Sequence, residues 1–569
     1  MRNGRWLIAP ALAAGIVVAA VFSGSATRSE AGTQQASNRP NVVVIMTDDQ
    51  AVESLRVMGN VRSLLANQGV TFDNNFASYP LCCPSRSTYL TGQYAHNHHV
   101  MGNVQPNGGY DKLDHTNTLP VWLQRAGYAT VHIGKYLNGY GRVRQTEIPP
   151  GCGEWYGSID PSTYRYFNYT VNENGKLVNY GASAADYQAD VYTRRAADVI
   201  RRFAADPRPL FLSVAYIAPH SGGPRDPDDP ANFATPAPAP RHRNLFASQP
   251  LPTPPSFNEA DVSDKPSGIR TRAVIPPGRI NAIRENYQQR LESLLAVDEG
   301  VAEIVRTLEA TGKLGRTYII FTSDNGFFHG EHRVQSGKVL VYEPSVRVPL
   351  IIRGPGIPRA GHRAQLAANI DLAATIADAA RIRPGRAPDG RSLLPMARDR
   401  LLFSGRDLLL ETPTYSAIHT PTRVYVEHAN GEKELYNLQA DPHQLTSQHA
   451  NPAFEQARVE LASRLMILRG CSGATCRQTP ELRLFASYRR GARGCARSSV
   501  RLAVGGGSAR RISQVHFYVR GRLVRRDARR PFTAVIPRRL LRGGVYTHSV
   551  VTLADSRRHT LPRRLRACS

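Results

Sequence analysis

Two apolar runs, each followed by acidic residues, are the feature of this sequence that most restricts its fold. The run from Asn41 to Met46 reads NVVVIM, and the run from Thr317 to Thr322 reads TYIIFT. Such unbroken apolar runs are typical of strands that are buried on both faces in a parallel sheet. Further strands are predicted at Thr130–Ile133 and Leu210–Tyr216, and three- and four-residue apolar spacing predicts a helix over Tyr287–Leu308. This alternation predicts an α/β sandwich with a mainly parallel central sheet.

Acidic and amide side chains follow both runs directly. Asp48 and Asp49 come after the first run, and Asp324 and Asn325 come after the second. Because ligands bind at the carboxyl ends of the strands in an open parallel sheet, we expect these side chains to meet at one edge. Carboxylates gathered so closely repel one another unless a cation neutralises them, and oxygen ligands favour Ca²⁺ or Mg²⁺ over Zn²⁺. The alternative is that they are unrelated turn and capping residues, for which Asp and Asn are also favoured.

The stretch LCCPSR, from Leu81 to Arg86, places two adjacent cysteines before a proline. Pro84 suits the first turn of a helix, which puts Cys82 at or just before the helix N-terminus. Free N–H groups and the helix dipole favour an anion there, and Arg86 could turn back toward the same spot as a fixed positive charge. The alternative is a buried or vicinally disulfide-bonded pair of cysteines.

The first residues indicate export. Two arginines precede an apolar run from Trp6 to Phe22, and small residues follow it. This pattern predicts a secretory signal peptide, residues 1–31, with cleavage between Ala26 and Ala31. The run is shorter than the ~20 residues of a membrane span, so a retained anchor is the less favoured alternative. The mature chain is therefore expected to be secreted or extracytoplasmic, without an integral membrane segment and with cell-surface association as a further option.

The positive charge is concentrated at the C-terminal end. From Arg477 to Ser569 there are 23 arginines and three acidic residues, so this segment carries +20 of the formal net charge of +27. We interpret it as a solvated basic face, with adhesion to acidic glycans or a cell wall as the alternative. Export and the lack of a zinc-finger or aromatic-stacking motif argue against nucleic acid as a partner.

Seven cysteines, an odd number, leave at least one of them unpaired within a monomer. Cys471 and Cys476 are close enough in the chain to close a local loop. Cys495 and Cys568 bracket the basic tail and could staple it, since disulfides persist outside the cytoplasm. The remaining cysteines are Cys82, Cys83 and Cys152.

Composition divides the chain into segments. The α/β pattern covers residues 38–385, and a smaller α+β subdomain is expected over 386–470, where short strands precede a helix at Pro452–Leu468. Within the first segment, Ser221–Pro277 is rich in proline and lacks periodicity, and a loop of that length is usually functional. Alternating segments and glycine turns over 477–569 predict a basic, β-rich appendage.

A set of short motifs connects these features. They are Thr47–Gln50, Cys82–Arg86 continuing into Thr91-Gly92-Gln93, Gly134–Tyr136, Ala218–His220, Ser323–Gly326, Ser336–Lys338, Arg347–Leu350, Arg353–Gly356, Glu434–Leu438 and Asp441-Pro442. Together they resemble the type I sulfatase family, whose signature is C-x-P-S-R followed by a T-G segment. The resemblance covers about residues 38–468 and implies an alkaline-phosphatase-like fold. Within the family, CCPSR with HNHHV at His96–Val100 and GKYLN at Gly134–Asn138 is most similar to the N-acetylglucosamine-6-sulfatase branch.

The resemblance also implies a role for each candidate residue. In this family the first signature cysteine is oxidised to Cα-formylglycine by a formylglycine-generating enzyme, so Cys82 would carry the aldehyde and its hydrate would attack sulfur. The divalent ion, Ca²⁺ or Mg²⁺, would lie among Asp48, Asp49, Asp324, Asn325 and Cys82. Lys135 and Lys338 would bind sulfate oxygens. His220 would hold the ester or protonate the leaving oxygen, and Arg86 would stabilise the hydrate. The implied substrate is a sulfated small molecule or glycan.

One position departs from the family pattern. Many arylsulfatases have a histidine two residues after the lysine equivalent to Lys135, where this chain has Leu137. This leaves His220 as the stronger candidate for assisting the leaving oxygen. The other histidines considered are His98, His99, His329 and His332. The first two lack the partner spacing of a zinc motif, and the last two follow Asp324 closely enough to be candidates for lining the pocket.

Two alternative functions fit parts of the same pattern. A metal, an anion pocket and a formylglycine also suit phosphodiester or phosphonate hydrolysis within the same superfamily. A catalytically silent chain with an unmodified cysteine would instead bind sulfated glycans through its pocket and basic tail. Paired assays on aryl sulfate and aryl phosphate esters distinguish a sulfatase from the first alternative. Mass analysis at Cys82 distinguishes an active, modified enzyme from the second.

Overall fold

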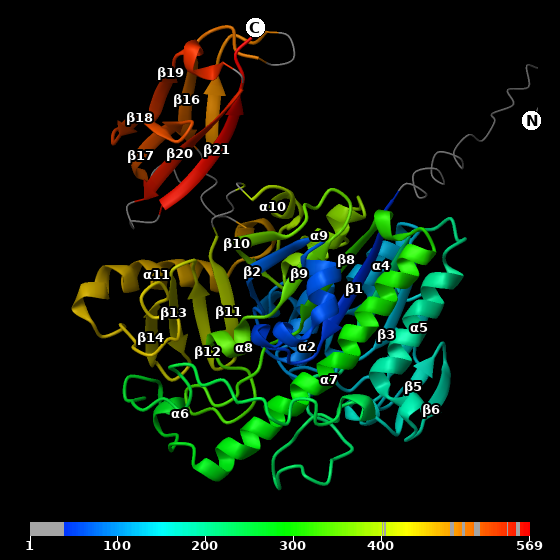
Figure 1. Cartoon of the computed structure of the whole chain (residues 1–569). Helices are drawn as coiled ribbons and strands as arrows, with labels where there is room; N and C mark the ends of the chain where they lie inside the picture. Colours follow the sequence, from blue (N-terminus) through cyan, green and yellow to red (C-terminus); the bar gives the residue numbers. More distant parts are fainter. Residues whose placement is uncertain are drawn as a thin grey trace, which may run out of the picture.

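A ten-stranded mixed sheet forms the centre of the molecule, with helices on both faces (Figure 1). The computed structural model describes residues 39–400, 402, 406–477, 483–491, 495–505, 512–542, 544–553 and 558–568, so the predicted signal peptide lies outside the described residues. The strand order is β10-β2-β9-β8-β1-β7-β3-β4-β5-β6. The strands are β1 (Asn41–Thr47), β2 (Val70–Phe76), β3 (Ala129–Gly134), β4 (Glu154–Ser158), β5 (Tyr169–Glu173), β6 (Lys176–Tyr180), β7 (Leu210–Ala215), β8 (Thr317–Ser323), β9 (Leu350–Arg353) and β10 (Gly361–Ala368).

The four predicted strands lie next to one another in the middle of this sheet. β1 is parallel to both β7 and β8, and β3 is parallel to β7. Antiparallel pairs involve β9 on one side and β5 and β6 at the far edge, so the sheet is mainly parallel, as expected. Because successive side chains of a strand point to opposite faces, Val42 and Val44 enter one apolar core while Val43 and Ile45 enter the other.

Helices cover the two cores. The core that contains Val43 is covered by α5 (Gln188–Arg202) and α7 (Pro277–Ala310), which pack against each other. The opposite core is covered by α2 (Cys82–Thr91), α4 (Leu119–Arg125) and α9 (Asp371–Ala379). The helix predicted over Tyr287–Leu308 is longer than expected, since α7 begins at Pro277. A proline is tolerated in the first turn of a helix, because its missing N–H would have no partner there. Shorter helices include α3 (Ala95–His98), α8 (Glu343–Val346) and α10 (Leu394–Arg398).

The proline-rich stretch Ser221–Pro277 is a long connection, as predicted, but it is anchored. It contains only a short 3-10 turn at Pro240–His242 and the short helix α6 (Ser267–Arg270). Phe233, Leu251 and Ile275 from this stretch pack against α7 in a small apolar cluster. These scattered apolar residues, which lack any helical or strand period, hold the connection against the main body.

A smaller antiparallel sheet follows the central one. It consists of β11 (Leu408–Thr412), β12 (Tyr415–His419), β13 (Arg423–His428) and β14 (Lys433–Asn437), in that order. The helix α11 (Glu455–Arg469) packs on this sheet through Leu461 and Leu465, after a 3-10 turn over Pro452–Phe454. Beyond the helix, Cys471 and Cys476 form a disulfide, as their spacing suggested.

The last strands form two sheets around a separate apolar core, which Figure 1 shows as a unit apart from the main body. The three-stranded sheet contains β15 (Arg483–Ser487), β16 (Val500–Gly505) and β19 (Thr533–Ile536). The four-stranded sheet has the order β18-β17-β20-β21, with β17 (Ile512–Val519), β18 (Arg522–Asp527), β20 (Val545–Leu553) and β21 (Arg558–Leu565). The disulfide Cys495–Cys568 ties the end of this appendage to its beginning. None of the helices within the described ranges has both the length and the apolar composition of a membrane span.

Candidate active site

The LCCPSR stretch begins a helix, as predicted. Leu81 is extended, α2 starts at Cys82, and Pro84 lies in the first turn. The Ser85 N–H donates to the Leu81 carbonyl at 2.9 Å and closes that turn. The helix ends before Gly92, whose φ of 69° lies in the left-handed region that favours glycine. Cys82 therefore occupies the end of the helix where the backbone N–H groups lack partners within the helix, and the Cys83 N–H donates to Asn103 Oδ1 at 2.9 Å.

The two adjacent cysteines face different surroundings. The Cys82 thiol lies 3.6 Å from Asp48 Oδ1 and 3.2 Å from Lys338 Nζ. The Cys83 thiol instead accepts a hydrogen bond from the Asn138 N–H at 3.0 Å, and the two thiols are not bonded to each other. Burial, with the charge of Asp48 adding to it, raises the pKa of Cys82 to about 11. The unmodified thiol is thus protonated at neutral pH and is a weak nucleophile.

The acidic residues from the two predicted strands meet at one edge of the sheet. β1 and β8 run in parallel with Thr47 beside Ser323, so the residues that follow them lie together. The Asp49 N–H donates to Asp324 Oδ1 at 3.1 Å, and the Asn325 amide donates to Asp49 Oδ1 at 2.7 Å. All four side chains, including Asp48, are buried. The predicted convergence is therefore present, and these are not unrelated turn residues.

The donor set fits a divalent cation. One ligand atom from each of Asp48, Asp49, Cys82 and His220 lies within 4.8 Å of the others. Asn325 Oδ1 is buried and has no hydrogen-bond partner in the part of the chain that the structure describes, and a buried carbonyl oxygen normally has one. Carboxylate and amide oxygens are the ligands that Ca²⁺ and Mg²⁺ prefer. His220, which the sequence pointed to as a catalytic residue, is a member of this cluster by position, whereas the predicted ligand Asp324 is not one of its four members.

Three cationic side chains match the three carboxylates. Lys135, directly after β3, donates to Asp48, and Lys338 donates to Asp49. Burial alone would raise the pKa of Asp49, but Lys338, His220 and Arg290 together outweigh it and lower that pKa to about 2. Arg86 faces the remaining carboxylate, so each of the three carboxylates has a cationic partner.

Arg86 connects three parts of the site. Its Nε donates to Asp324 Oδ2 at 2.8 Å, its Nη1 donates to the Lys135 carbonyl at 2.9 Å, and its Nη2 lies 3.4 Å from Asp48 Oδ2. The side chain comes from the second turn of α2 and reaches back to the start of the helix, as the sequence suggested. It fixes the positions of Asp48 and Asp324 relative to each other.

His220 follows β7 and lies at the more open side of the cluster, with 22 % of its side chain exposed. Its Nδ1 hydrogen-bonds the Ser221 carbonyl at 2.7 Å, so that nitrogen carries the proton and Nε2 faces Asp49 Oδ2 at 3.7 Å. Burial lowers the pKa of His220 and outweighs the opposing charge of Asp49. The neutral imidazole therefore presents an acceptor nitrogen to the centre of the site.

Two residues near the site were missed in the sequence. The Lys135 ammonium lies 4.7 Å from the centre of the Tyr164 ring, and that ring also lies 4.7 Å from the His220 ring. Arg290, buried in α7, donates to the Asp49 carbonyl and covers the Phe327 ring at 3.8 Å. Tyr164 lies in a short 3-10 turn with no motif around it, whereas Arg290 could have been noticed as a charge within the apolar stripe of its helix.

The family departure at Leu137 has a structural explanation. Leu137 is buried in the core on the α2 side of the sheet and does not point into the charged cluster. The next residue, Asn138, contacts the Cys83 thiol and donates to the Tyr164 hydroxyl. This segment therefore supports the start of α2 and the tyrosine beside Lys135.

The other histidines lie apart from the cluster. His332 is buried and pairs with Glu259 at 2.6 Å, so it does not line the site. His329 lines a cavity of about 500 Å³ together with Tyr287 and Phe327, and the lining of that cavity does not include Cys82. His98 uses both ring nitrogens on Thr88 and Val100, while His99 is exposed at the end of α3.

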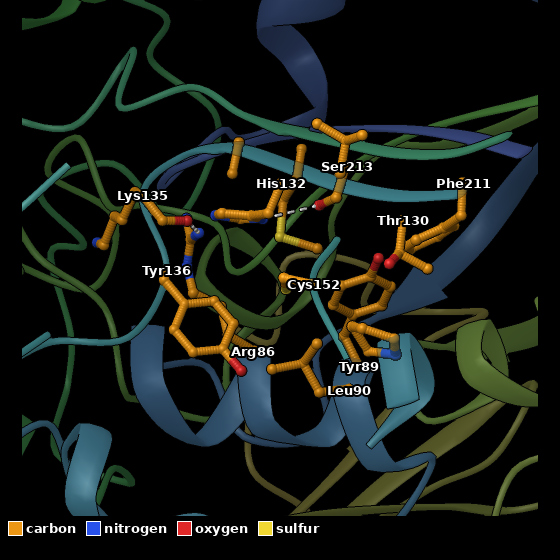
Figure 2. Close-up of a pocket in the computed structure, with 14 residues that line it drawn as sticks. Arg86, Tyr89, Leu90, Thr130, His132, Lys135, Tyr136, Cys152, Phe211 and Ser213 are labelled. Atoms are coloured by element: carbon orange, nitrogen blue, oxygen red, sulfur yellow. Dashed lines mark hydrogen bonds between the residues drawn. The ribbon is translucent and has the colours of Figure 1, made fainter. Parts of the chain in front are cut away.

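A small cavity of about 30 Å³ lies behind Arg86 and Lys135, between α2 and the central strands (Figure 2). Figure 2 shows Cys152 in its wall, and His132 hydrogen-bonded to Ser213 at 3.3 Å. The Cys152 thiol is free, and burial raises its pKa to about 12. Cys83 and Cys152 therefore do not pair in this structure.

Comparison with known families identifies the chain. The family model described as sulfatase matches residues 40–382, and the model of the N-sulphoglucosamine sulphohydrolase C-terminal region matches residues 330–470. The chain belongs to the sulfatase family. This confirms the resemblance that the short motifs indicated.

Named relatives support the same activity. An arylsulfatase from Volvox carteri is 33% identical over 517 residues, covering 81% of this chain and 79% of the relative. N-acetylglucosamine-6-sulfatase from Homo sapiens is 31% identical over 498 residues, covering 78% of this chain and 87% of the relative. This sulfatase is therefore a sulfuric ester hydrolase.

Solved structures share the fold. A protein solved in complex with its substrate D-glucosamine-2-N,6-O-disulfate has a TM-score of 0.63 at 23% identity and covers 75% of this chain and 97% of its own. The phosphonate monoester hydrolase of Agrobacterium radiobacter has a TM-score of 0.54 at 23% identity, covering 76% and 95%. At these identities the likeness shows the fold alone, and it confirms the expected alkaline-phosphatase-like sandwich.

Proposed function

We propose that this sulfatase is a secreted enzyme that hydrolyses sulfate esters of glucosamine-6-sulfate-type glycans or aryl sulfates, with Cys82 converted to Cα-formylglycine beside a divalent cation. One observation carries the proposal: the Cys82 thiol begins α2 at the edge where the acids meet, between Asp48 and Lys338. Its neighbour Cys83 faces Asn138 instead. Only the first cysteine is thus in position to serve the charged cluster.

The cation is proposed to be Ca²⁺, with Mg²⁺ as the alternative. Its ligands would come from Asp48, Asp49, Asp324, Asn325 and the modified residue 82. When bound, it orients the hydrated aldehyde and stabilises negative charge that develops on the substrate.

The two lysines are proposed to bind the sulfate oxygens. Lys338 is the more accessible of them, with 12 % of its side chain exposed against 2 % for Lys135. Lys338 and His220 therefore form the side from which a sulfate ester enters, and Lys135 forms the inner wall. Ammonium groups held at the developing charge stabilise the transition state more than they would in water.

His220 is proposed to hold the ester oxygen or to deliver the proton to the leaving alcohol. Its Nε2 faces the cluster because Nδ1 is tied to the Ser221 carbonyl. The nearby Asp49 carboxylate favours the protonated imidazole when a proton is required. Arg86 would stabilise the hydrate, from a position fixed by its hydrogen bonds to Asp324 and the Lys135 carbonyl.

The proposed substrate class and location follow from the relatives. N-acetylglucosamine-6-sulfatases from Homo sapiens and Capra hircus match over most of this chain, and extracellular sulfatase homologues match over about two thirds of it. Secretion further requires that residues 1–31 function as a signal peptide. Formation of the aldehyde at Cys82 requires a formylglycine-generating enzyme as a maturation partner. The phosphodiester or phosphonate alternative rests on fold likeness alone.

Two measurements test the proposal. Peptide mass analysis of natively produced protein should find the aldehyde at Cys82 and a thiol at Cys83. An aryl sulfate should be hydrolysed far faster than the matching aryl phosphate, and a Cys82→Ala variant should lose this activity while Cys83→Ala keeps it. An unmodified Cys82 in active protein, or a preference for the phosphate ester, would refute the mechanism or the activity respectively.

The substrate class needs its own assay. Disaccharides sulfated only at the 6-position of glucosamine should be desulfated, and matched disaccharides sulfated only at the 2-position of the uronic acid should not. If aryl sulfate is cleaved but no glucosamine 6-sulfate is released, the activity stands and the glycan assignment is wrong.

A further inference from the structure

Six exposed arginines gather on one hairpin of the appendage. They are Arg520, Arg522, Arg525, Arg526, Arg529 and Arg530. We call residues 520–530, which form the turn after β17, strand β18 and the start of its exit, the basic hairpin. Its one acidic residue, Asp527, is buried and accepts hydrogen bonds from the N–H groups of Arg529 and Thr533. All of the exposed charged side chains of the hairpin are therefore cationic.

The backbone explains why these side chains are exposed. Arg520 and Gly521, with φ of 51° and 76°, make the two-residue turn that such hairpins prefer. β18 is the edge strand of its sheet, and a bulge at Val524 leaves Arg525 opposite Phe517 but Leu523 opposite Tyr518. Every residue from 522 to 526 is exposed. Arg522 and Arg525 lie opposite Val519 and Phe517 on one face of the sheet, and Arg526 lies opposite His516 on the other face. All three are exposed because β18 is an edge strand.

A flat aromatic surface adjoins the arginines. The rings of Tyr518 and His548 stack at 4.7 Å with an angle of 8° between their planes. Leu523, which pairs with Tyr518 across the strands, is 41 % exposed, and Arg526 lies opposite His516 on the same face. A half-buried aromatic surface beside cationic groups suits a ligand that has both flat apolar faces and anionic substituents.

Solubility and edge protection do not account for this surface. Charged residues along an edge strand prevent association with the edge of another sheet, but a few charged residues of mixed sign are enough for that purpose. A field of one sign destabilises the folded state through self-repulsion. From Arg477 onward the chain carries 23 arginines against three acidic residues, so this repulsion is large unless an anionic partner relieves it.

We propose that the basic hairpin, together with the Tyr518–His548 stack, binds a sulfated linear polysaccharide. The choice of a sulfated chain over other polyanions rests on the proposed function, because the substrate esters of this enzyme lie on such chains. Sugar rings supply the flat faces for the aromatic stack, and sulfate groups supply the anions for the guanidinium groups. Holding the polymer at the appendage raises its effective concentration at the catalytic domain.

The test uses the full-length protein and immobilised heparin as the sulfated probe. The triple variant Arg522→Gln, Arg525→Gln and Arg526→Gln should bind heparin about 100-fold more weakly at low salt, since each exposed charge contributes roughly fivefold. The slope of a plot of log Kd against log salt concentration should be smaller by about three for this variant, because three ion contacts are lost. Tyr518→Ala should weaken binding without changing this salt dependence.

A matched control removes three other exposed arginines of the appendage with the same change in net charge: Arg497→Gln, Arg501→Gln and Arg566→Gln. This control should keep nearly the full affinity for heparin, and both variants should hydrolyse a small aryl sulfate as the unaltered enzyme does. Equal weakening in the two triple variants would show that net charge, not this hairpin, drives binding and would overturn the proposal.

Two competitors and one further variant complete the design. Hyaluronan, which lacks sulfate, and duplex DNA should compete poorly with heparin; competition by either at similar charge concentration would overturn the assignment to a sulfated polysaccharide. The Cys82→Ala variant should bind heparin normally, because the hairpin lies outside the catalytic site. A chain that binds heparin through the hairpin but cleaves no sulfate ester would refute the proposed function and leave the binding surface intact.

Discussion

Replacing Arg86 by methionine provides a direct test of the site. Methionine fills a similar space without charge or hydrogen-bond donors, and Arg86 is 3 % exposed. The change removes the partner of the buried Asp324 carboxylate, the 3.4 Å contact to Asp48, and the donor to the Lys135 carbonyl. Two carboxylates would then remain in the interior without their guanidinium.

The expected loss of stability can be worked from these contacts. Breaking a buried ion pair by removing one partner costs about 3–5 kcal/mol, and leaving the Lys135 carbonyl without its donor adds about 1 kcal/mol. A total of about 4–6 kcal/mol lowers the melting temperature of a domain of this size by on the order of 10 °C. Differential scanning fluorimetry at a fixed heating rate, with either EDTA or excess Ca²⁺, measures this loss.

The cation dependence is the informative part of this experiment. If the ion lies against Asp48 and Asp324, it replaces the lost counter-charge of Asp324 in the Arg86→Met variant, whereas Asp48 keeps its pair with Lys135. Added Ca²⁺ should therefore raise the melting temperature of this variant by more than it raises that of the unaltered protein.

A buried arginine away from the site supplies the control. Arg406 is 4 % exposed and binds the buried Asp371 carboxylate with both terminal nitrogens. Arg406→Met should lose a comparable amount of stability, and its response to Ca²⁺ should match that of the unaltered protein. The same Ca²⁺ response in both variants would refute the location of the ion, and a loss under about 1 kcal/mol for Arg86→Met would refute the buried pair.

Further predictions concern the reaction and the fold. Cys82→Ala should lower aryl sulfate hydrolysis by more than about 10⁴-fold, while Cys83→Ala keeps most of it, as initial rates will show. Lys338→Ala should lower kcat/KM by about 10²–10³-fold in the same assay. Dialysis against EDTA should abolish activity, and Ca²⁺ should restore it more fully than Zn²⁺. Burial lowers the pKa of His96, but Glu411 outweighs it and raises that pKa above 6.5. The ion pair between His96 and Glu411 therefore contributes its full stability below about pH 6.5, and this contribution is lost as the pH rises through the raised pKa. The free energy of unfolding in urea should consequently differ most between His96→Gln and the unaltered protein at low pH.

The core of the site was predictable because it depends on strand ends. Asp48 and Asp324 directly follow long apolar runs, and parallel neighbours in a sheet bring their carboxyl ends to the same edge. The position of Cys82 was predictable for a similar reason, since Pro84 fixes where the helix begins. Local patterns that define where an element ends thus determined which side chains meet.

Residues that reach the site from the middle of other elements were not predictable in the same way. Tyr164 reaches Lys135 from a 3-10 turn between β4 and β5, and Arg290 reaches Asp49 from the middle of α7. Their positions depend on how α7 and the β4–β5 connection pack on the sheet. That packing is a property of the whole core, which no short stretch of sequence encodes.

The burial of Cys82 also restricts when it can be modified. Successive residues of a helix point about 100° apart, so the start of α2 directs Cys82 to the acids and Cys83 to Asn138. Cys82 is 1 % exposed, and Asp48 and Lys338 cover its thiol. If Cys82 is converted as proposed, the folded helix leaves its thiol out of reach of an oxidising enzyme. We therefore expect conversion to precede the docking of α2 onto the sheet, so that protein folded without conversion should resist later modification until it is unfolded.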